Sequence, residues 1–89
     1  MSYTEIYQDI RTLIFKKLKS FRDSASYTAN FQDDFGLERW EVNLLLYNVE
    51  DHFNLRLKAG LENEVDTINQ LVAVVHREKQ RQKEALKAA

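Results

Sequence analysis

The apolar residues of the first twenty positions recur at spacings of three and four, which is typical of a helix with one buried face. Ser2 followed by Glu5 has the form of a capping box, so we predict a helix from about residue 3 to about Ser20. Polar residues after it indicate a loop. The predicted buried face consists of Ile6, Ile10, Leu13, Ile14, Leu18 and Phe21, and the loop is marked by Asp23, Ser24, Ser26 and Asn30.

A second helix is predicted after Gly36, from about Arg39 to about His52. Its apolar residues form two stripes instead of one. The stripe that we expect to face the core consists of Val42, Leu45, Leu46, Val49 and Phe53. The other stripe has the spacing i, i+4 and i+7 and consists of Trp40, Leu44 and Tyr47.

The remaining pattern predicts a loop, a short helix and a last helix. Leu55 and Leu57 point inward in the loop between Asn54 and Gly60, and a short helix or single turn follows around Leu61–Val65. Thr67 and Gln70 have the spacing of a second capping box at the start of the last helix. The buried face of that helix is Ile68, Leu71, Val72 and Val75. A short strand over Leu71–Val75 is the alternative, but no second strand of similar quality is available to pair with it.

Composition indicates one small all-α domain. The chain has 89 residues, which is too few for two cores, and it contains no Pro and only two Gly. The absence of Cys excludes disulfides and thiolate metal sites, and the separated His52 and His76 do not form a metal-ligand cluster. The apolar runs are too short to span a bilayer, and residues 1–5 lack the pattern of a secretory signal, so we expect a cytoplasmic protein with no membrane contact.

Charge is distributed unevenly along the chain. Residues 31–66 hold nine acidic and three basic residues, whereas residues 67–89 hold two acidic and five basic ones. An acidic centre argues against nucleic acid as its partner, because phosphate binding requires a basic surface. A small DNA-binding domain that uses the basic residues 77–87 is a remaining, lower-ranked hypothesis. After His76 the apolar pattern fades, so residues 77–89 are predicted to be a polar, basic helical extension or a frayed tail.

Three short segments resemble acyl carrier proteins. The stretch from Asn30 to Trp40 is similar to the family's loop S-F-x-x-D-L-G-x-D-S-L, which leads into the second helix. Residues 49–53 (V-E-D-H-F) resemble the family's L-E-E-E-F, and residues 66–68 (D-T-I) resemble its T-T-V. The resemblance implies a four-helix bundle over residues 1–76, with three longer helices and a short third one. The alternative is an unrelated four-helix bundle that is similar by chance.

The resemblance also implies that the chain lacks the attachment site for the family's cofactor. In acyl carrier proteins the Ser of D-S-L holds the phosphopantetheine arm, and Arg39 falls at this position without a gap. A guanidinium stays protonated and cannot attack the phosphate of coenzyme A. We therefore expect no phosphopantetheine. Arg39 is interpreted as drift after loss of the arm, as a partner contact, or as a misalignment that hides a real site. The other hydroxyls considered, which lie in the wrong elements, are Ser20, Ser24, Ser26, Thr28 and Thr67.

The start of the second helix is unusual in its charges. Glu38 replaces the family's Asp and is not a favoured N-cap residue. Arg39 places a cation where the helix dipole is positive, which costs about 0.3–1 kcal/mol unless a carboxylate offsets it. Asp33, Asp34, Glu38 and Glu41 are the candidate neighbours.

A partner-binding surface is predicted on the outward face of this helix. Trp and Tyr are enriched where proteins meet, and a small bundle rarely needs two core faces on one helix. The alternative is that the second stripe packs against the loop Tyr27–Leu37 or the short third helix. The predicted surface consists of Glu38, Arg39, Trp40, Glu41, Leu44, Tyr47, Glu50 and Asp51.

The sequence favours a protein-interaction module related to fatty-acid or secondary-metabolite biosynthesis. Its expected partner is a protein, for which a carrier-using enzyme is the main candidate, and the chain itself is expected to be a monomer or weak homo-oligomer. A functional acyl carrier that is modified elsewhere is the alternative. An enzyme is not expected, because the sequence around Asp33 and Asp34 indicates a surface loop without an apolar pocket, and the two acids are predicted to shape that loop instead. His52, near a helix end, is predicted to be structural.

Overall fold

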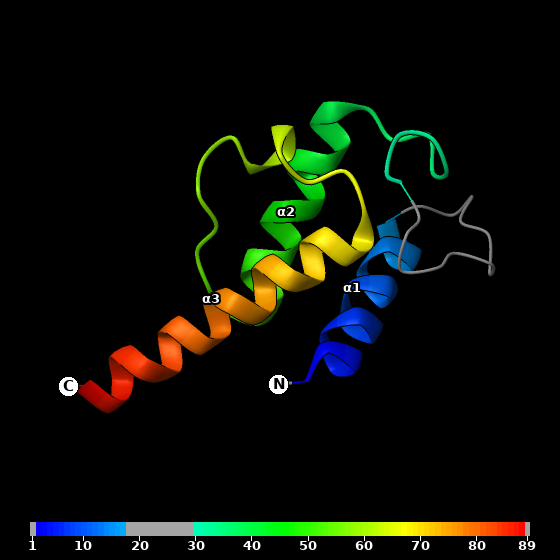
Figure 1. The fold of residues 1–89 in the computed structure, drawn as a ribbon. Helices are drawn as coiled ribbons and strands as arrows, with labels where there is room; N and C mark the ends of the chain where they lie inside the picture. The colour runs from blue at the N-terminus through cyan, green and yellow to red at the C-terminus, as the bar shows by residue number, and fades with distance from the viewer. Residues whose placement is uncertain (1, 18–29, 89) are drawn as a thin grey trace.

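Three α-helices and one 3₁₀ turn form the fold in the computed structural model, which describes residues 2–17 and 30–88 (Figure 1). The elements in chain order are α1 (Tyr3–Lys17), α2 (Arg39–Phe53), η1 (Leu61–Asn63) and α3 (Ile68–Ala88). The described ranges contain no strand, only an isolated bridge between Asn30 and Thr67. The all-α prediction is thus confirmed. Residues 2–17 and 30–88 contain three α-helices where four helices were expected, because the short third helix is a single 3₁₀ turn.

α1 begins where its capping box predicts. The Ser2 hydroxyl accepts the backbone N–H of Glu5 at 3.2 Å, and the Glu5 carboxylate accepts the backbone N–H of Ser2 at 3.4 Å. Its isoleucines at spacings of four are completely buried, and Leu13 packs partly against the core. These isoleucines are Ile6, Ile10 and Ile14. The end of the helix predicted near Ser20, the core residues Leu18 and Phe21, and the polar loop up to residue 29 fall outside the described residues.

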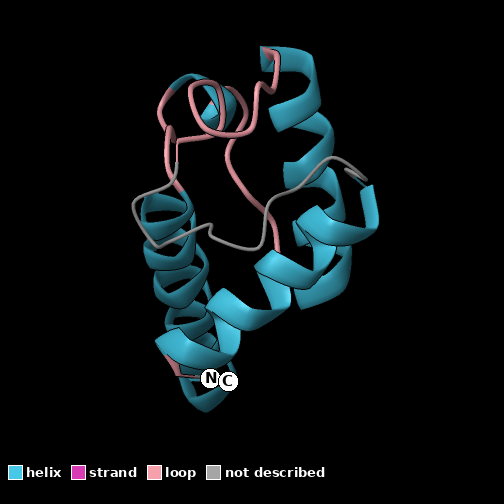
Figure 2. Cartoon of the chain, turned by 90° about the vertical axis from the view of Figure 1, so that its right-hand side faces the viewer, coloured by secondary structure: helices cyan, strands magenta, loops and turns pink. Residues whose placement is uncertain are grey.

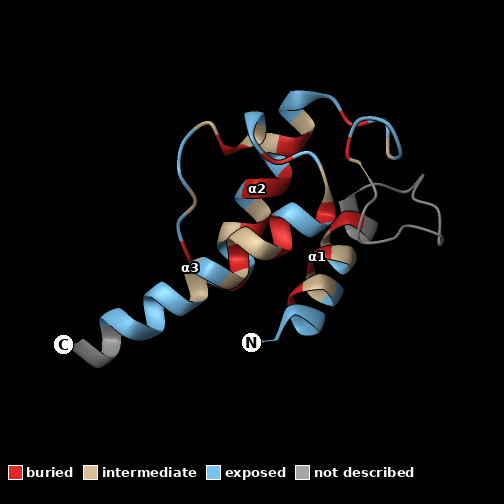
Figure 3. Cartoon of the chain, in the orientation of Figure 1, coloured by how far each residue is buried: buried red, intermediate tan, exposed pale blue. Residues whose placement is uncertain are grey.

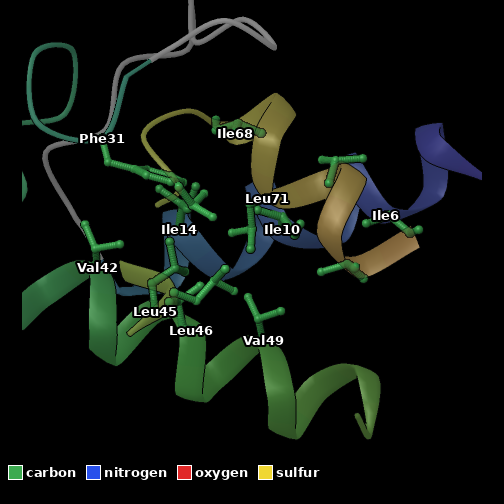
Figure 4. Close-up of a cluster of buried hydrophobic side chains, with 14 of the residues drawn as sticks. Ile6, Ile10, Ile14, Phe31, Val42, Leu45, Leu46, Val49, Ile68 and Leu71 are labelled. Atoms are coloured by element: carbon green, nitrogen blue, oxygen red, sulfur yellow. The ribbon is translucent and has the colours of Figure 1, made fainter. Parts of the chain in front are cut away.

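α1 is central to the packing. It packs against both α2 and α3, and Figure 2 shows it running obliquely across these two helices. The inner stripe of α2 meets the α1 isoleucines and the first turns of α3 in one apolar cluster (Figure 4). The predicted inner stripe is confirmed, since its five members are all buried: Val42, Leu45, Leu46, Val49 and Phe53. Burial of this apolar surface is the main term that stabilises the fold.

The segment after α2 is held by one carboxylate. Asn54 ends the helix in the left-handed conformation, with φ 54°, and the side chain of Glu50 then accepts the backbone N–H of Leu57 at 2.8 Å. Leu55 is buried as predicted, whereas Leu57 is half-buried. Gly60, with φ 82°, turns the chain into η1.

α3 extends beyond the body of the protein. Its capping box is confirmed, because the Thr67 hydroxyl accepts the backbone N–H of Gln70 at 3.2 Å and Gln70 Oε1 accepts that of Thr67 at the same distance. The strand alternative for Leu71–Val75 is wrong, since these residues are helical. The helix continues without a break past His76, and most side chains beyond it are exposed (Figure 3). This extension still contacts the body, because Gln82 Nε2 donates to the carbonyl of Asn54 at 2.6 Å.

Candidate functional site

The loop before α2 has a defined shape. The backbone N–H of Leu37 donates to the carbonyl of Phe31 at 2.8 Å, and both side chains are buried, which fixes the two ends of a compact turn. The turn also contacts the start of α3, since the N–H of Phe31 donates to the carbonyl of Asp66 at 2.8 Å. Gly36, with φ 66°, allows the left-handed backbone that redirects the chain into α2.

Polar side chains hold the same turn from within. Asp34 Oδ2 accepts the backbone N–H of Asn30 at 2.6 Å, and Asn30 Oδ1 accepts the N–H groups of Gln32 and Asp33 at 2.9 and 3.0 Å. The prediction that the acidic pair shapes the loop is therefore confirmed for Asp34. The Asp33 carboxylate accepts no hydrogen bond from the described residues and forms no ion pair with them.

Arg39 is the first residue of α2 and its side chain is exposed. None of the four predicted carboxylates pairs with it, and the described part of the chain contains no ion pair or hydrogen bond to its guanidinium. The neighbouring acids have other roles. Glu41 Oε1 accepts the backbone N–H of Glu38 at 3.1 Å, and Glu38 Oε2 accepts the indole N–H of Trp40 at 2.6 Å. Arg39 therefore presents an uncompensated cation at the helix start.

The second apolar stripe of α2 lies in solvent. Trp40 is 63% exposed, Leu44 50% and Tyr47 61%, so the alternative in which these three side chains pack into the fold is wrong. Soluble domains of this size seldom expose a contiguous stripe of two aromatic rings and a leucine. The Glu38 contact satisfies the indole N–H and restrains the Trp40 ring, which reduces the entropy that a partner would have to remove.

A shallow hollow of about 190 Å³ lies beside this stripe. Trp40 and Leu44 line it together with core residues of two other elements, Ile14 of α1 and Leu37 of the preceding loop. The sequence pattern does not reveal these two residues as part of the surface, since each belongs to a separate stretch of apolar positions. Their proximity depends on how α1 and the loop pack against α2.

The acidic rim of the predicted surface is smaller than its sequence implies. Glu50 is half-buried and binds the backbone of Leu57, and Glu41 is half-buried and caps α2. Asp51 and Glu38 are exposed. Of the four predicted acids, only Glu38 and Asp51 are therefore exposed enough to contact a partner.

His52 has a structural contact, as predicted. Its Nε2 lies 3.3 Å from Asp9 Oδ2, so the end of α2 is joined to α1, and its ring meets that of Phe53 edge-on. No group of three or more potential metal ligands occurs among residues 2–17 and 30–88. None of the described helices is long and apolar enough to cross a bilayer.

Comparison with known proteins supports a relationship to acyl carrier proteins. The chain is 24% identical over 79 residues to the acyl carrier protein of Borrelia garinii subsp. bavariensis, a match that covers 89% of this chain and 99% of that protein. The acyl carrier protein of Borreliella burgdorferi has the same identity and coverage. That of Guillardia theta is 28% identical over 80 residues, which covers 82% of this chain and 99% of the relative. No family model matches the chain.

Proposed function

We propose that this chain is an acyl-carrier-like domain that carries no phosphopantetheine arm and acts by binding another protein. The observation that carries the proposal is Arg39. It is exposed at the first position of α2, directly after the turn that resembles the carrier loop, which is where the resemblance places the attachment Ser. The site is thus accessible to a modifying enzyme but offers the wrong chemical group.

The chemistry of this substitution excludes attachment at Arg39. Transfer of the arm requires an oxygen nucleophile that attacks the β-phosphate of coenzyme A and forms a phosphodiester. The guanidinium of Arg39 is permanently protonated and has no free lone pair. Of the other hydroxyls considered from the sequence, Thr67 lies among the described residues, and its hydroxyl already accepts the backbone N–H of Gln70 at the start of α3. We propose that the protein needs no cofactor and catalyses no reaction of its own.

The exposed stripe of α2 supports the binding role. Aromatic side chains in such a position are the residues that dominate interface energies, and the restrained ring of Trp40 is suited to be the central anchor. We propose that Trp40, Leu44 and Tyr47 contact the partner, with Arg39, Glu38 and Asp51 at the rim. A carrier-using enzyme of fatty-acid or secondary-metabolite biosynthesis in the cytoplasm is the partner class that fits the relationship to acyl carrier proteins.

Intact-protein mass spectrometry tests the loss of the arm. The protein is incubated with coenzyme A and a broad-specificity phosphopantetheinyl transferase, and we expect no gain in mass. The matched variant is Arg39→Ser, which restores a hydroxyl at an exposed helix start and is expected to gain the mass of one arm. Modification of the unchanged protein would contradict the proposal.

Site-specific photo-crosslinking tests the binding role. A photoreactive amino acid replaces Leu44 in the native cell, and the control places it at Asn69, an exposed residue of α3. We expect a discrete crosslinked protein from position 44 that is absent when Trp40→Ala is added. Equal crosslinking from both positions would contradict a specific surface on α2.

The second candidate is an acyl carrier that is modified at another residue. The names of the relatives, all acyl carrier proteins, favour it. The hydroxyls to examine are those considered from the sequence, Ser20, Ser24, Ser26, Thr28 and Thr67, although none of them lies in the element where the resemblance places the attachment site. If the unchanged protein gains mass in the experiment above, peptide mapping of the modified protein identifies the residue and establishes this candidate.

A further inference from the structure

A second surface lies between α3 and the segment that follows α2. Two adjacent open hollows of about 630 and 300 Å³ share Arg56, Glu78 and Arg81 in their linings, and the two together are called the groove. Figure 1 shows the chain after α2 passing beside α3. Along α3 the groove extends from Val74 to Ala85, which corresponds to about 16 Å of helix.

The groove concentrates positive charge from two elements that are distant in sequence. Arg56 and Lys58 come from the loop, and Arg77 and Arg81 come from α3. Glu78 is the one acid that lines either hollow. Bringing four cations to one groove is unfavourable unless counter-charges are present, so the pairing of each cation determines what the groove can bind.

The internal ion pairs leave positive charge unmatched. Glu78 Oε1 lies 3.2 Å from Arg81 Nη1 and 3.9 Å from Arg77 Nε, so two guanidinium groups share one carboxylate. Lys58 Nζ pairs with Glu64 at 2.7 Å. Arg56 is exposed and has no hydrogen bond or ion pair with any described residue. Two acids thus pair with three of the four bases, and the side chain of Arg56 is available to a ligand.

The base of the groove is apolar. Leu57 and Val74 are half-buried members of its lining, so each keeps part of its side chain open to the groove, whereas Leu61 beneath them is buried. An elongated open groove cannot enclose most of a small molecule, as a cofactor pocket does. It can instead accommodate an extended segment of polypeptide. Apolar side chains of that segment would contact Leu57, and its carboxylates would contact the arginines of the groove.

We propose that this groove binds an acidic peptide segment of a partner protein, in which Asp or Glu side chains alternate with Leu or Ile. Arg56 and Arg81 contact the carboxylates, because guanidinium groups form two parallel hydrogen bonds with them. Leu57 and Val74 contact the apolar side chains. The groove shares no residue with the surface on α2, so this inference stands or fails independently of the proposed function.

An NMR titration tests the inference on the full-length, isotopically labelled protein. The probe is a synthetic peptide of about eight residues of alternating Glu and Leu, which in extended form spans the groove. The control peptide has Gln in place of Glu. We expect amide shifts from the acidic peptide at Arg56, Leu57, Val74 and Arg81, loss of binding with the control peptide, and weaker binding at higher salt.

Charge-neutralising variants distinguish the groove from general attraction. Arg56→Gln is expected to weaken binding about three- to tenfold, because it removes a charge-assisted contact. Lys83→Gln removes the same charge from an exposed position of α3 outside the groove, so its affinity should stay within about twofold. Arg81→Gln is the second groove variant, with circular dichroism to verify that each variant is folded.

Several results would overturn the inference. These are equal weakening by Lys83→Gln, peptide-induced shifts centred on Trp40 and Leu44, and no shifts at about 1 mM peptide, which corresponds to negligible affinity. A DNA duplex that displaces the peptide and binds more tightly would assign the groove to nucleic acid. Shifts at Arg56 that depend on protein concentration without peptide would assign it to a second copy of the chain.

Discussion

The two apolar stripes of α2 have similar residue types but opposite solvent exposure. Val42, Leu45 and Val49 of the inner stripe are buried in the core cluster that includes the isoleucines of α1, whereas Trp40, Leu44 and Tyr47 are at least half exposed. Both stripes have helical spacing and similar apolar character. Their difference arises from where the other elements lie, since α1 and η1 both pack against α2 and still leave the side chains of the outer stripe at least half exposed.

The inner stripe stabilises the fold, whereas the outer stripe forms a surface that another molecule could contact. Burial of the inner stripe contributes to the free energy of folding. The outer stripe leaves large rings in water, which contributes nothing to folding and increases the risk of aggregation. This is the surface that we propose a partner protein covers.

The strongest test of this comparison uses adjacent leucines of one helix. Leu45→Ala should lower the free energy of unfolding by about 2–5 kcal/mol, because it leaves a cavity in the core. Leu44→Ala should change it by about 0.5 kcal/mol or less, since that side chain is half exposed. Urea denaturation followed by circular dichroism measures both. Similar losses for the two variants would show that the outer stripe also supports the fold.

A smaller effect is expected at Asn54, the residue that ends α2. Asn54 has φ 54°, a conformation that Asn tolerates better than Ala, and it ends α2 directly after Phe53. Asn54→Ala should therefore lower the free energy of unfolding by about 1 kcal/mol. Asn54→Gly is the matched control, because Gly adopts this conformation freely. Equal destabilisation by both variants would indicate that contacts of the Asn side chain, instead of backbone geometry, matter here.

The sequence predicts those parts of the fold that depend on neighbours along the chain. The starts of α1 and α3 follow from Ser2 with Glu5 and from Thr67 with Gln70, because a capping box is complete within four residues. The inner stripe of α2 follows from helical spacing. The short third helix was predicted less well, since a single 3₁₀ turn over Leu61–Asn63 and a short α-helix have nearly the same local pattern.

The sequence does not predict features that depend on distant contacts. Spacing identifies the inner stripe of α2, but it could not show whether the outer stripe is buried or exposed, because that depends on how the other elements pack around α2. Glu50 was expected to face a partner, yet it binds the backbone of Leu57, seven residues along the chain. The hydrogen bond from Gln82 to Asn54 joins residues 28 positions apart, and no sequence pattern indicates that they meet. The groove beside α3 could not be predicted for the same reason.

The charge at the start of α2 offers a test in which stability should increase. Arg39 is a cation at the positive end of the helix dipole and has no acidic partner among the described residues. Arg39→Glu should raise the free energy of unfolding by about 0.3–1 kcal/mol, and Arg39→Gln by about half of that. Urea denaturation at low salt measures the change, which should shrink in high salt. A loss of stability would mean that the guanidinium makes a favourable contact in solution.

The last prediction concerns the surface alone and requires no change in stability. Trp40 is the only Trp of the chain, so its fluorescence reports on the outer stripe. With the ring mostly in solvent, acrylamide should quench the folded protein nearly as well as the urea-unfolded one. Glu38→Gln removes the charged acceptor that restrains the indole, so it should alter the emission; because Glu38 is also the N-cap of α2 and Gln keeps a side-chain acceptor there, the free energy of unfolding should change by about 1 kcal/mol or less. Strong protection from quenching in the free protein at low concentration would show that the ring is covered within the monomer. In that case the outer stripe would have no surface to offer a partner.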